Sequence, residues 1–457
     1  MKKLVALLLC LMMVVPATLA SAETAEGKVL NIWCWNDEFQ SRFNAYYPEV
    51  KEIAEDKSTT TLNDGTIVKW TINPNEGNNY QNKLDEALRA QESAAADDKI
   101  DIFLIEADYA LKYVDSPYTL DVKADIGLTD EDLGGQYKYT QEIATSADGK
   151  LKAVTWQATP GLFAYRRSIA KDVLGTDDPD AVQEALADWD KFNAVAEQAA
   201  AKGYYMLSGY DDAYRTFSNN VSAPWVADDG ETVVVDANLM KWVDQTKLYT
   251  DKGYNHKSSL WDATWAADQG PTGKVFGFFY STWGINFTLL GNSLATPTSE
   301  GGKEEVGNGI YGDYAVCEGP QPYYWGGTWI CGAAGSDNLE TIKDVMLKLT
   351  CDEAIMKQIT MDTQDYTNNE KAMNEIANSD FKSDFLGGQN HIALFAEAAA
   401  KIDMSNAGPY DQGLNESFQT AFKDYFTGNV KEDAAKANFE TAIKEKYPEL
   451  TEVVWPA

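Results

Sequence analysis

The chain has 457 residues and a net charge of −33, from 71 acidic and 38 basic side chains. A negative field of this size repels phosphate backbones, so the composition excludes nucleic acid as a binding partner. The length is greater than one hydrophobic core usually supports and predicts two domains.

The N-terminus has the pattern of a secretory leader. Two lysines precede an apolar run over residues 4–15, and small residues at 20–22 suit a signal peptidase, so we predict a signal peptide over residues 1–22. The apolar run is too short for a spanning anchor. Three leucines precede Cys10 where a lipoprotein signal has small residues, so no lipid anchor is predicted. We expect the mature protein outside the cell or at its surface, or in the periplasm if the cell is Gram-negative.

Cysteine and histidine are too scarce and too scattered for a zinc site. The mature chain has no CxxC pair and the chain has only two histidines, so we predict neither a metal nor a cofactor. An even number of cysteines in an exported chain permits disulfides, and a Cys317–Cys331 bond is the pairing to test. Four buried free thiols are the favoured interpretation. The cysteines of the mature chain are Cys34, Cys317, Cys331 and Cys351.

The first hundred residues after the leader alternate between strand and helix patterns. Residues 29–35 predict a buried strand, and residues 67–72 predict a second strand with outward polar positions. An apolar face over residues 80–88 predicts a helix, and the buried run at 100–106 predicts another strand. This order favours an open, largely parallel sheet covered by helices.

Two later segments predict chain crossings between lobes. The apolar stretch 153–167 is interrupted by a Pro-Gly pair, and the aromatic stretch 323–335 resembles a return crossing. Between them, apolar residues at helical spacing over 182–195 predict one helix, and 275–285 predicts an aromatic-rich strand. The last hundred residues are predicted to be helical, with phenylalanines repeating every four residues from Phe418.

Several stretches, taken in order, carry a family resemblance. They are IWCW, DDKIDIFLIEADYA, TWQATPG, YSTWGI and PYYWGGTWI, followed near the C-terminus by YTNNEKAM, GGQNHIALFAEAAAKI and GPYDQGLNESF. Together with the leader, this order is similar to bacterial extracellular solute-binding proteins, the capture components of ABC importers. The carbohydrate-binding branch, which includes the maltose-binding proteins, is the most similar in pattern. The likeness covers nearly the whole mature chain.

The resemblance implies a fold and partners. The implied fold is α/β, a two-lobed periplasmic-binding-protein-like (class II) clamshell with two or three hinge crossings and a helical C-terminus, which closes on its ligand. The first lobe would hold residues 23–158 and 323–362, and the second lobe residues 159–322 and 363–457. The implied partners are an oligosaccharide and the permease subunits of an ABC transporter, and we expect a monomer.

The chemistry of sugar recognition explains the residues that follow the first predicted strand. A neutral sugar presents C–H patches on its faces, which suit flat aromatic rings, and hydroxyls at its edge, which suit planar polar groups. In open α/β sheets, ligands bind beyond the carboxyl ends of the strands. Trp35 and the polar residues 36–38 come where the first strand ends, and the same rule selects the other candidates. The predicted ligand-binding residues are Trp35, Asn36, Glu38, Glu76, Asn79, Glu106, Asp108, Trp156, Asp211, Asp212, Arg215, Tyr280, Trp283, Tyr324, Trp325, Gly326, Gly327 and Tyr366.

Each of these residues also has a purely structural interpretation. Trp35 fits core packing as well as a stacking platform, and Glu38 and Asp108 could each begin a helix, where carboxylates suit the N-terminal dipole. Asp211 and Asp212 also fit a solvated loop. Trp325 carries the prediction furthest, because the two glycines after it let backbone amides approach a ligand.

Three functions compete at this level. The first is capture of an oligosaccharide between the lobes and its delivery to a permease, without catalysis. The alternative is a secreted glycoside hydrolase, which needs aromatic subsites and only two carboxylates beside the bond it cuts. A third is a surface protein that binds another protein. The predicted crossings and the family pattern favour the first.

Overall fold

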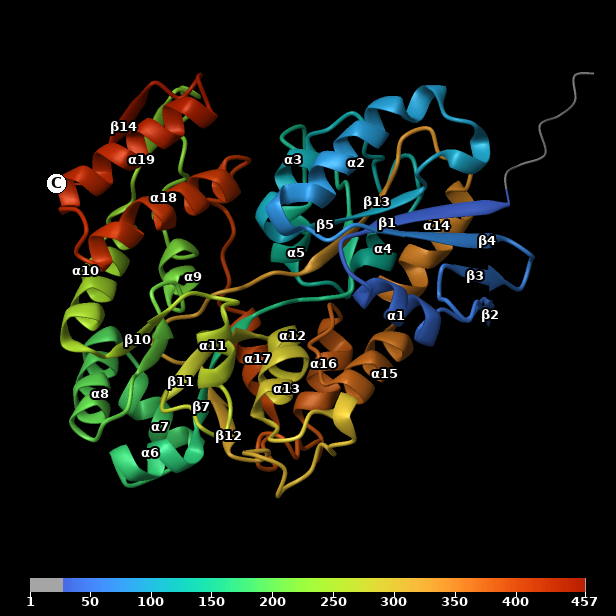
Figure 1. Ribbon diagram of the computed structural model, residues 1–457. Coiled ribbons are helices and arrows are strands. Elements are labelled where there is room, and N and C mark those ends of the chain that lie inside the picture. The colour runs from blue at the N-terminus through green and yellow to red at the C-terminus, as the bar shows by residue number, and fades with distance from the viewer. Residues whose placement is uncertain (1–27, 457) are drawn as a thin grey trace, which may run out of the picture.

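The computed structural model describes residues 28–456, so the predicted signal peptide lies outside the described part of the chain. Figure 1 shows two α/β lobes with extended segments running between them. The predicted two-lobed periplasmic-binding-protein fold is confirmed. No helix within 28–456 combines the length and apolar character that crossing a membrane requires.

The first lobe is built on a seven-stranded mixed sheet in the order β2-β3-β4-β1-β5-β13-β6. Its centre is parallel, because β1 pairs in parallel with β4 and β5, whereas the other pairings are antiparallel. The sheet is therefore less uniformly parallel than predicted. Its strands are β1 (Val29–Cys34), β2 (Val50–Ile53), β3 (Thr59–Leu62), β4 (Ile67–Ile72), β5 (Ile102–Glu106), β6 (Val154–Thr155) and β13 (Thr328–Gly332).

Helices pack around this sheet, with α3 against β5 and α14 against β13. The stripe of Tyr80, Leu84 and Leu88 on α2 is fully buried, which agrees with its predicted apolar face. The helices of the first lobe are α1 (Glu38–Tyr46), α2 (Asn79–Ala90), α3 (Ala110–Val114), α4 (Asp130–Leu133), α5 (Lys138–Ile143), α14 (Leu339–Met346), α15 (Glu353–Thr363) and α16 (Glu370–Ala377).

The second lobe has a fully buried three-stranded antiparallel sheet in the order β11-β7-β12, and two small parallel pairs. Leu162, Phe163, Phe278 and Phe279 on this sheet pack into its core. The strands are β7 (Gly161–Arg166), β8 (Leu207–Gly209), β9 (Thr232–Val234), β10 (Asn255–Ser258), β11 (Gly277–Ser281), β12 (Tyr314–Cys317) and β14 (Glu452–Val454).

Helices make up most of the second lobe, and the C-terminus is helical as predicted (Figure 1). The stripe of Phe418, Phe422 and Phe426 on α18 is buried. The helices are α6 (Arg167–Leu174), α7 (Pro179–Leu186), α8 (Trp189–Ala201), α9 (Tyr214–Ser218), α10 (Ala237–Lys252), α11 (Ala263–Asp268), α12 (Thr282–Gly284), α13 (Leu290–Ser293), α17 (His391–Ala399), α18 (Asp411–Phe426) and α19 (Glu432–Lys446).

Three segments between the lobes lie side by side. Residues 156–160 bond to residues 323–327 through the Trp325 N–H to the Thr159 carbonyl at 3.1 Å. They also bond to residues 364–368, where the Asn368 N–H donates to the Trp156 carbonyl at 2.7 Å. The Asn368 side chain also donates to the carbonyl of Thr155 in the first lobe. The third segment therefore still contacts the first lobe after residue 363, where the sequence analysis places the start of the second lobe.

Two expected elements differ from the structure, and one cysteine is less buried than expected. The helical stripe over 182–195 is two helices, because α7 ends at Leu186 and Asp188 caps the start of α8 by accepting a hydrogen bond from the Lys191 N–H. The strand predicted at 275–285 ends at Ser281 and continues as α12 and the π-helix η5 (Ile285–Leu289). All four cysteines of residues 28–456 are free, which agrees with the favoured interpretation and shows no bond between Cys317 and Cys331; three are buried, and only Cys351 departs from the expectation because it is partly exposed.

Replacing Gly161 with alanine is expected to lower the free energy of unfolding of the protein by about 1–3 kcal/mol, the usual cost of overpacking. An added Cβ at Gly161 would lie 2.1 Å from the ring of Tyr323, which is buried and whose hydroxyl donates to the carbonyls of Leu162 and Tyr280. Urea unfolding measures the loss. Gly291→Ala is the control, because nothing lies within 4 Å of its Cβ position. Equal stability of the two variants would contradict this packing.

Candidate functional site

A cavity of about 550 Å³ lies between the two lobes, and we call it the main chamber. Its volume falls in the range of pockets that take small ligands. One wall comes from the carboxyl ends of β1 and β5, and the other from α9, α12 and α18. The lining residues are Trp35, Asn36, Asp37, Glu38, Asn75, Asn78, Glu106, Asp108, Tyr109, Gln157, Arg215, Trp261, Trp283, Phe287, Trp325, Gly326, Gly327, Thr328, Gln412 and Glu416.

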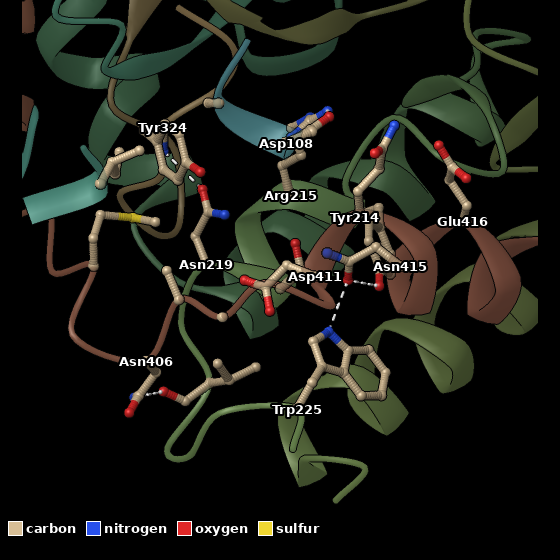
Figure 2. Close-up of a pocket in the computed structure, with 18 of the residues that line it drawn as sticks. Asp108, Tyr214, Arg215, Asn219, Trp225, Tyr324, Asn406, Asp411, Asn415 and Glu416 are labelled. Carbon is tan, nitrogen blue, oxygen red and sulfur yellow. Dashed lines mark hydrogen bonds and ion pairs between the residues drawn. The ribbon is translucent and has the colours of Figure 1, made fainter. Parts of the chain in front are cut away.

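A smaller cavity of about 180 Å³ adjoins it on the side of the second lobe, and we call it the side chamber. Figure 2 shows its polar lining, which includes Asn219, Asp411 and Asn415, with the rings of Tyr214, Trp225 and Tyr324 around them. Asp211 also lines it. The residues that line both chambers are Asp108, Arg215, Gln412 and Glu416.

Aromatic rings of both lobes face the main chamber. Trp35 is half-buried and meets Tyr109 edge to face at 6.2 Å between ring centroids, so it serves both as packing and as cleft surface. Opposite it, Trp261 stacks on Trp283 at 6.1 Å with an angle of 16° between the ring planes. Trp325 meets Trp283 edge to face at 5.3 Å. These rings offer flat apolar surface to a ligand.

Trp261 is the residue that sequence reasoning missed most clearly. Its side chain is 56% exposed, and its backbone has φ of 71°, a conformation that a bulky side chain rarely adopts. Such strain often marks functional positions. Phe287 on η5 lines the same chamber and is 72% exposed. Trp261 lies three residues after β10, a short strand that the sequence analysis does not predict, and Phe287 lies six residues after β11, so the strand-end rule does not select them.

Gly326 and Gly327 let the chain pass close to the rings. Both have positive φ, 74° and 105°, which favours glycine. A Cβ at Gly326 would lie 2.9 Å from Nε1 of Trp283. That same Nε1 donates to the carbonyl of Trp325 at 3.1 Å, which fixes the Trp283 ring against the crossing. The absence of a side chain at Gly326 thus leaves room for the Trp283 ring to lie against the segment that carries Trp325.

Asp108 and Arg215 form an ion pair across the cleft. The two guanidinium nitrogens of Arg215 on α9 donate to the two carboxylate oxygens of Asp108, at 2.7 and 2.6 Å. Asp108 lies in the short 3-10 turn η4 (Ala107–Tyr109), directly after β5. The guanidinium carbon also lies 5.3 Å from the centroid of the Trp325 ring. Burial works to raise the pKa of Asp108, but Arg215 outweighs it and lowers that pKa.

Two further carboxyl groups of the main chamber have raised pKa values. Burial, with the neighbouring charge of Asp108, raises the pKa of Glu106 well above its usual range. Burial, with the charge of Asp365, raises the pKa of Glu38 to about 7. The Gln157 side chain donates to Glu38 at 3.0 Å and holds it in place. Both acids can exchange hydrogen bonds with a ligand's hydroxyls.

The stability gain from Glu106→Gln is expected to be larger at pH 8 than at pH 5. In the unfolded chain Glu106 ionises above its ordinary pKa of 4.5, whereas the folded protein keeps it neutral to higher pH, so its cost to folding grows as pH rises through this window. Urea unfolding of the variant and the parent at both pH values measures the difference. Glu76→Gln, an exposed position, is the control. A gain that is equal at both pH values would contradict the raised pKa.

Six predicted binding residues line neither chamber, which corrects those assignments: Trp156, Asp212, Tyr280 and Tyr366, together with Glu76 and Asn79. Trp156 is 1% exposed and stacks on Phe39 at 5.2 Å, inside the first lobe. Tyr280 is buried beneath Trp325 and donates to Gln269, and Tyr366 is buried with its hydroxyl against that of Tyr137. Asp212 is buried and accepts from the backbone N–H groups of Ser208 and Gly209, so it holds a loop.

The turn after β4 shows why sequence position alone misleads. Glu76 and Asn79 do not line the main chamber, whereas their neighbours Asn75 and Asn78 do. Asn78 adopts a left-handed conformation, with φ of 59°, which turns the chain just before α2 and directs the neighbouring side chains differently. Asn79 instead donates to the carbonyl of Pro74.

Two lining residues from the last part of the chain also escaped prediction. Gln412 and Glu416 lie four residues apart on α18, so one face of this helix presents both side chains to the cleft. The stretch GPYDQGLNESF contains them and contributed to the family resemblance, but nothing in its local pattern links it to strand ends. Within residues 28–456, no cluster of histidine, cysteine and acidic side chains is arranged to hold a metal ion.

Two α/β lobes joined by crossing segments, with a cleft between them lined from both sides, define a two-lobed binding protein. The model of one family, bacterial extracellular solute-binding proteins, matches residues 57–385, and the chain belongs to that family. Its members bind solutes for ABC transport outside the cell and are not enzymes, which excludes the glycoside hydrolase alternative. A comparison with curated proteins finds no match.

Solved structures share this fold at low sequence identity. A family 1 extracellular solute-binding protein is 15% identical with a TM-score of 0.69, over 92% of this chain and 99% of the other. A binding protein of a B. animalis subsp. lactis ABC transporter, in complex with beta-1,6-galactobiose, is 17% identical with a TM-score of 0.67, over 94% and 100%. Maltose-bound MalE3 of T. maritima is 13% identical with a TM-score of 0.60, over 91% and 98%.

Proposed function

We propose that this protein captures an oligosaccharide in the main chamber and delivers it to the permease of an ABC importer. The main support for the proposal is that aromatic rings line one side of the cleft and hydrogen-bonding side chains line the other. Trp261, Trp283 and Trp325 offer rings from one side, while Glu38 and Glu106 offer hydrogen-bonding oxygens from the other. Flat apolar faces and planar polar groups in one cavity match the two kinds of surface that a sugar presents.

The solved relatives support the same ligand class. Two structures that share the fold contain galactobiose and maltose, both carbohydrates. The ligand contacts that we propose combine the predicted residues that line the cleft with those that the structure adds. They are Trp35, Asn36, Glu38, Asn75, Asn78, Glu106, Tyr109, Gln157, Trp261, Trp283, Phe287, Trp325, Gly326, Gly327, Gln412 and Glu416, with Asp108 and Arg215 where the main chamber adjoins the side chamber.

A thermal-shift screen against plant and host glycans tests the proposal. A ligand that binds only the folded state raises the melting temperature by mass action, so the matching oligosaccharide should produce a shift that grows with its concentration. Chromatography after incubation should recover the sugar intact. If no glycan shifts the melting temperature, whereas amino acids, peptides or polyamines do, the ligand class is wrong although the binding function stands.

The remaining expectations concern the cell. We propose that the leader over residues 1–22 directs export of the protein. We also propose that the protein acts as a monomer and that the permease subunits recognise its closed form. Binding of the protein to its permease should then increase when the saccharide is present, because closure joins surfaces of both lobes. Equal binding with and without the saccharide would contradict recognition of the closed form.

A further inference from the structure

The main and side chambers meet at the Asp108–Arg215 ion pair. Both residues line both cavities, and they come from opposite lobes, Asp108 after β5 and Arg215 on α9. Their two parallel hydrogen bonds and the Trp325 ring against the guanidinium hold the pair in one geometry. Figure 2 shows the pair directly beside the side chamber. It therefore stands between the two spaces.

The side chamber has polar groups suited to a sugar. Trp225 and Tyr214 both donate to the Oδ1 atom of Asn415, at 3.1 and 2.5 Å, which orients that amide beside the chamber (Figure 2). The Oδ1 atom of Asp411 is buried and makes no hydrogen bond of normal geometry among residues 28–456, although the carboxyl lies near the backbone of Gly408. Burial raises the pKa of Asp411 to about 7. A buried polar atom without a partner is costly, and a ligand hydroxyl would satisfy it.

We propose that the Asp108–Arg215 pair is a partition that limits the length of the saccharide in the main chamber, and that the side chamber is a further sugar subsite reached when the pair parts. This inference rests on the proposed function. A ligand that ends at the pair keeps both charges satisfied. A longer ligand must separate two side chains that neutralise each other, and it gains the contacts at Asn415 and Asp411 in return.

The length dependence of affinity tests the partition. Calorimetry would compare di-, tri- and tetrasaccharides of the α-1,4-linked glucose and β-1,6-linked galactose series. Asp108→Ala/Arg215→Ala removes both charges together, so no buried charge is left alone. For each protein we compare the affinity for the tetrasaccharide with the affinity for the disaccharide. This ratio should be about tenfold or more higher in the variant than in the parent protein, because one or two added hydrogen bonds give an effect of that size. Adding Asp411→Ala, which removes the Oδ1 atom, should remove much of that gain.

Controls separate the alternatives. Lys112→Ala breaks an exposed ion pair with Asp85 in the first lobe and should keep the parent's length dependence. If the double alanine variant does not fold, Asp108→Asn/Arg215→Gln keeps polar side chains at both positions without the charges. An unchanged affinity ratio, or equal weakening at every length, would overturn the partition. If the parent protein binds no saccharide of any kind, the proposed function fails instead.

Discussion

Trp283→Ala is expected to weaken saccharide binding by more than about 1 kcal/mol, because it removes one ring of the platform and the edge-to-face contact with its neighbour. Trp283 is half-buried, stacks on Trp261, and holds the Trp325 carbonyl through its Nε1. Trp325→Ala should weaken binding by at least as much. Calorimetry with the best glycan of the screen measures both effects.

Trp455→Ala is the matched control for these substitutions. Trp455 is also half-buried and has a lysine, Lys436, 5.2 Å from its ring, but it packs on Phe418 near the C-terminus, away from the cleft. Its loss should affect stability and leave affinity unchanged. Trp325 is nearly buried, so its truncation also costs folding energy, and binding is compared only for folded variants. Unchanged affinity in both cleft variants would remove the platform assignment without affecting the fold.

Arg215→Ala alone is expected to destabilise the protein by about 2 kcal/mol, and more than the double variant that also removes Asp108. Breaking a buried pair leaves an uncompensated charge, which costs about 3–5 kcal/mol when burial is complete. The side chains of Arg215 and Asp108 remain 25% and 33% exposed, so water reduces the penalty here. Urea unfolding of both variants measures the ordering. A double variant less stable than Arg215→Ala would show that the pair itself contributes more than the charge left behind.

The sequence predicted the fold well where local patterns are strong. The buried strands β1 and β5 and the apolar faces of α2 and α18 follow from periodicity, and the crossings follow from their aromatic and Pro-Gly stretches. The boundary errors occur where short polar signals act, as at Asp188, whose cap separates two helices. Such signals change the backbone direction without changing the hydrophobic pattern.

The site could be predicted only in part, because contact with a cleft is not a local property. Trp35 and Trp156 both follow apolar strand residues, yet one faces the main chamber and the other stacks inside the first lobe. Successive side chains of an extended chain point to opposite sides, so an error of one position changes which side chain faces the cleft. The sequence could not predict which of these tryptophans faces the cleft.

By itself, the sequence determined the class of fold, the exported character and the kinds of side chain that gather at strand ends, because these depend on periodicity, composition and motifs within short stretches. Only the tertiary structure decided which residues line the cleft. Asp108 meets Arg215 only because the two lobes pack against each other, and Trp261 stacks on Trp283 because the second lobe packs the segment after β10 against α12. Contacts between residues far apart in the chain depend on that packing, and no single stretch of sequence specifies them.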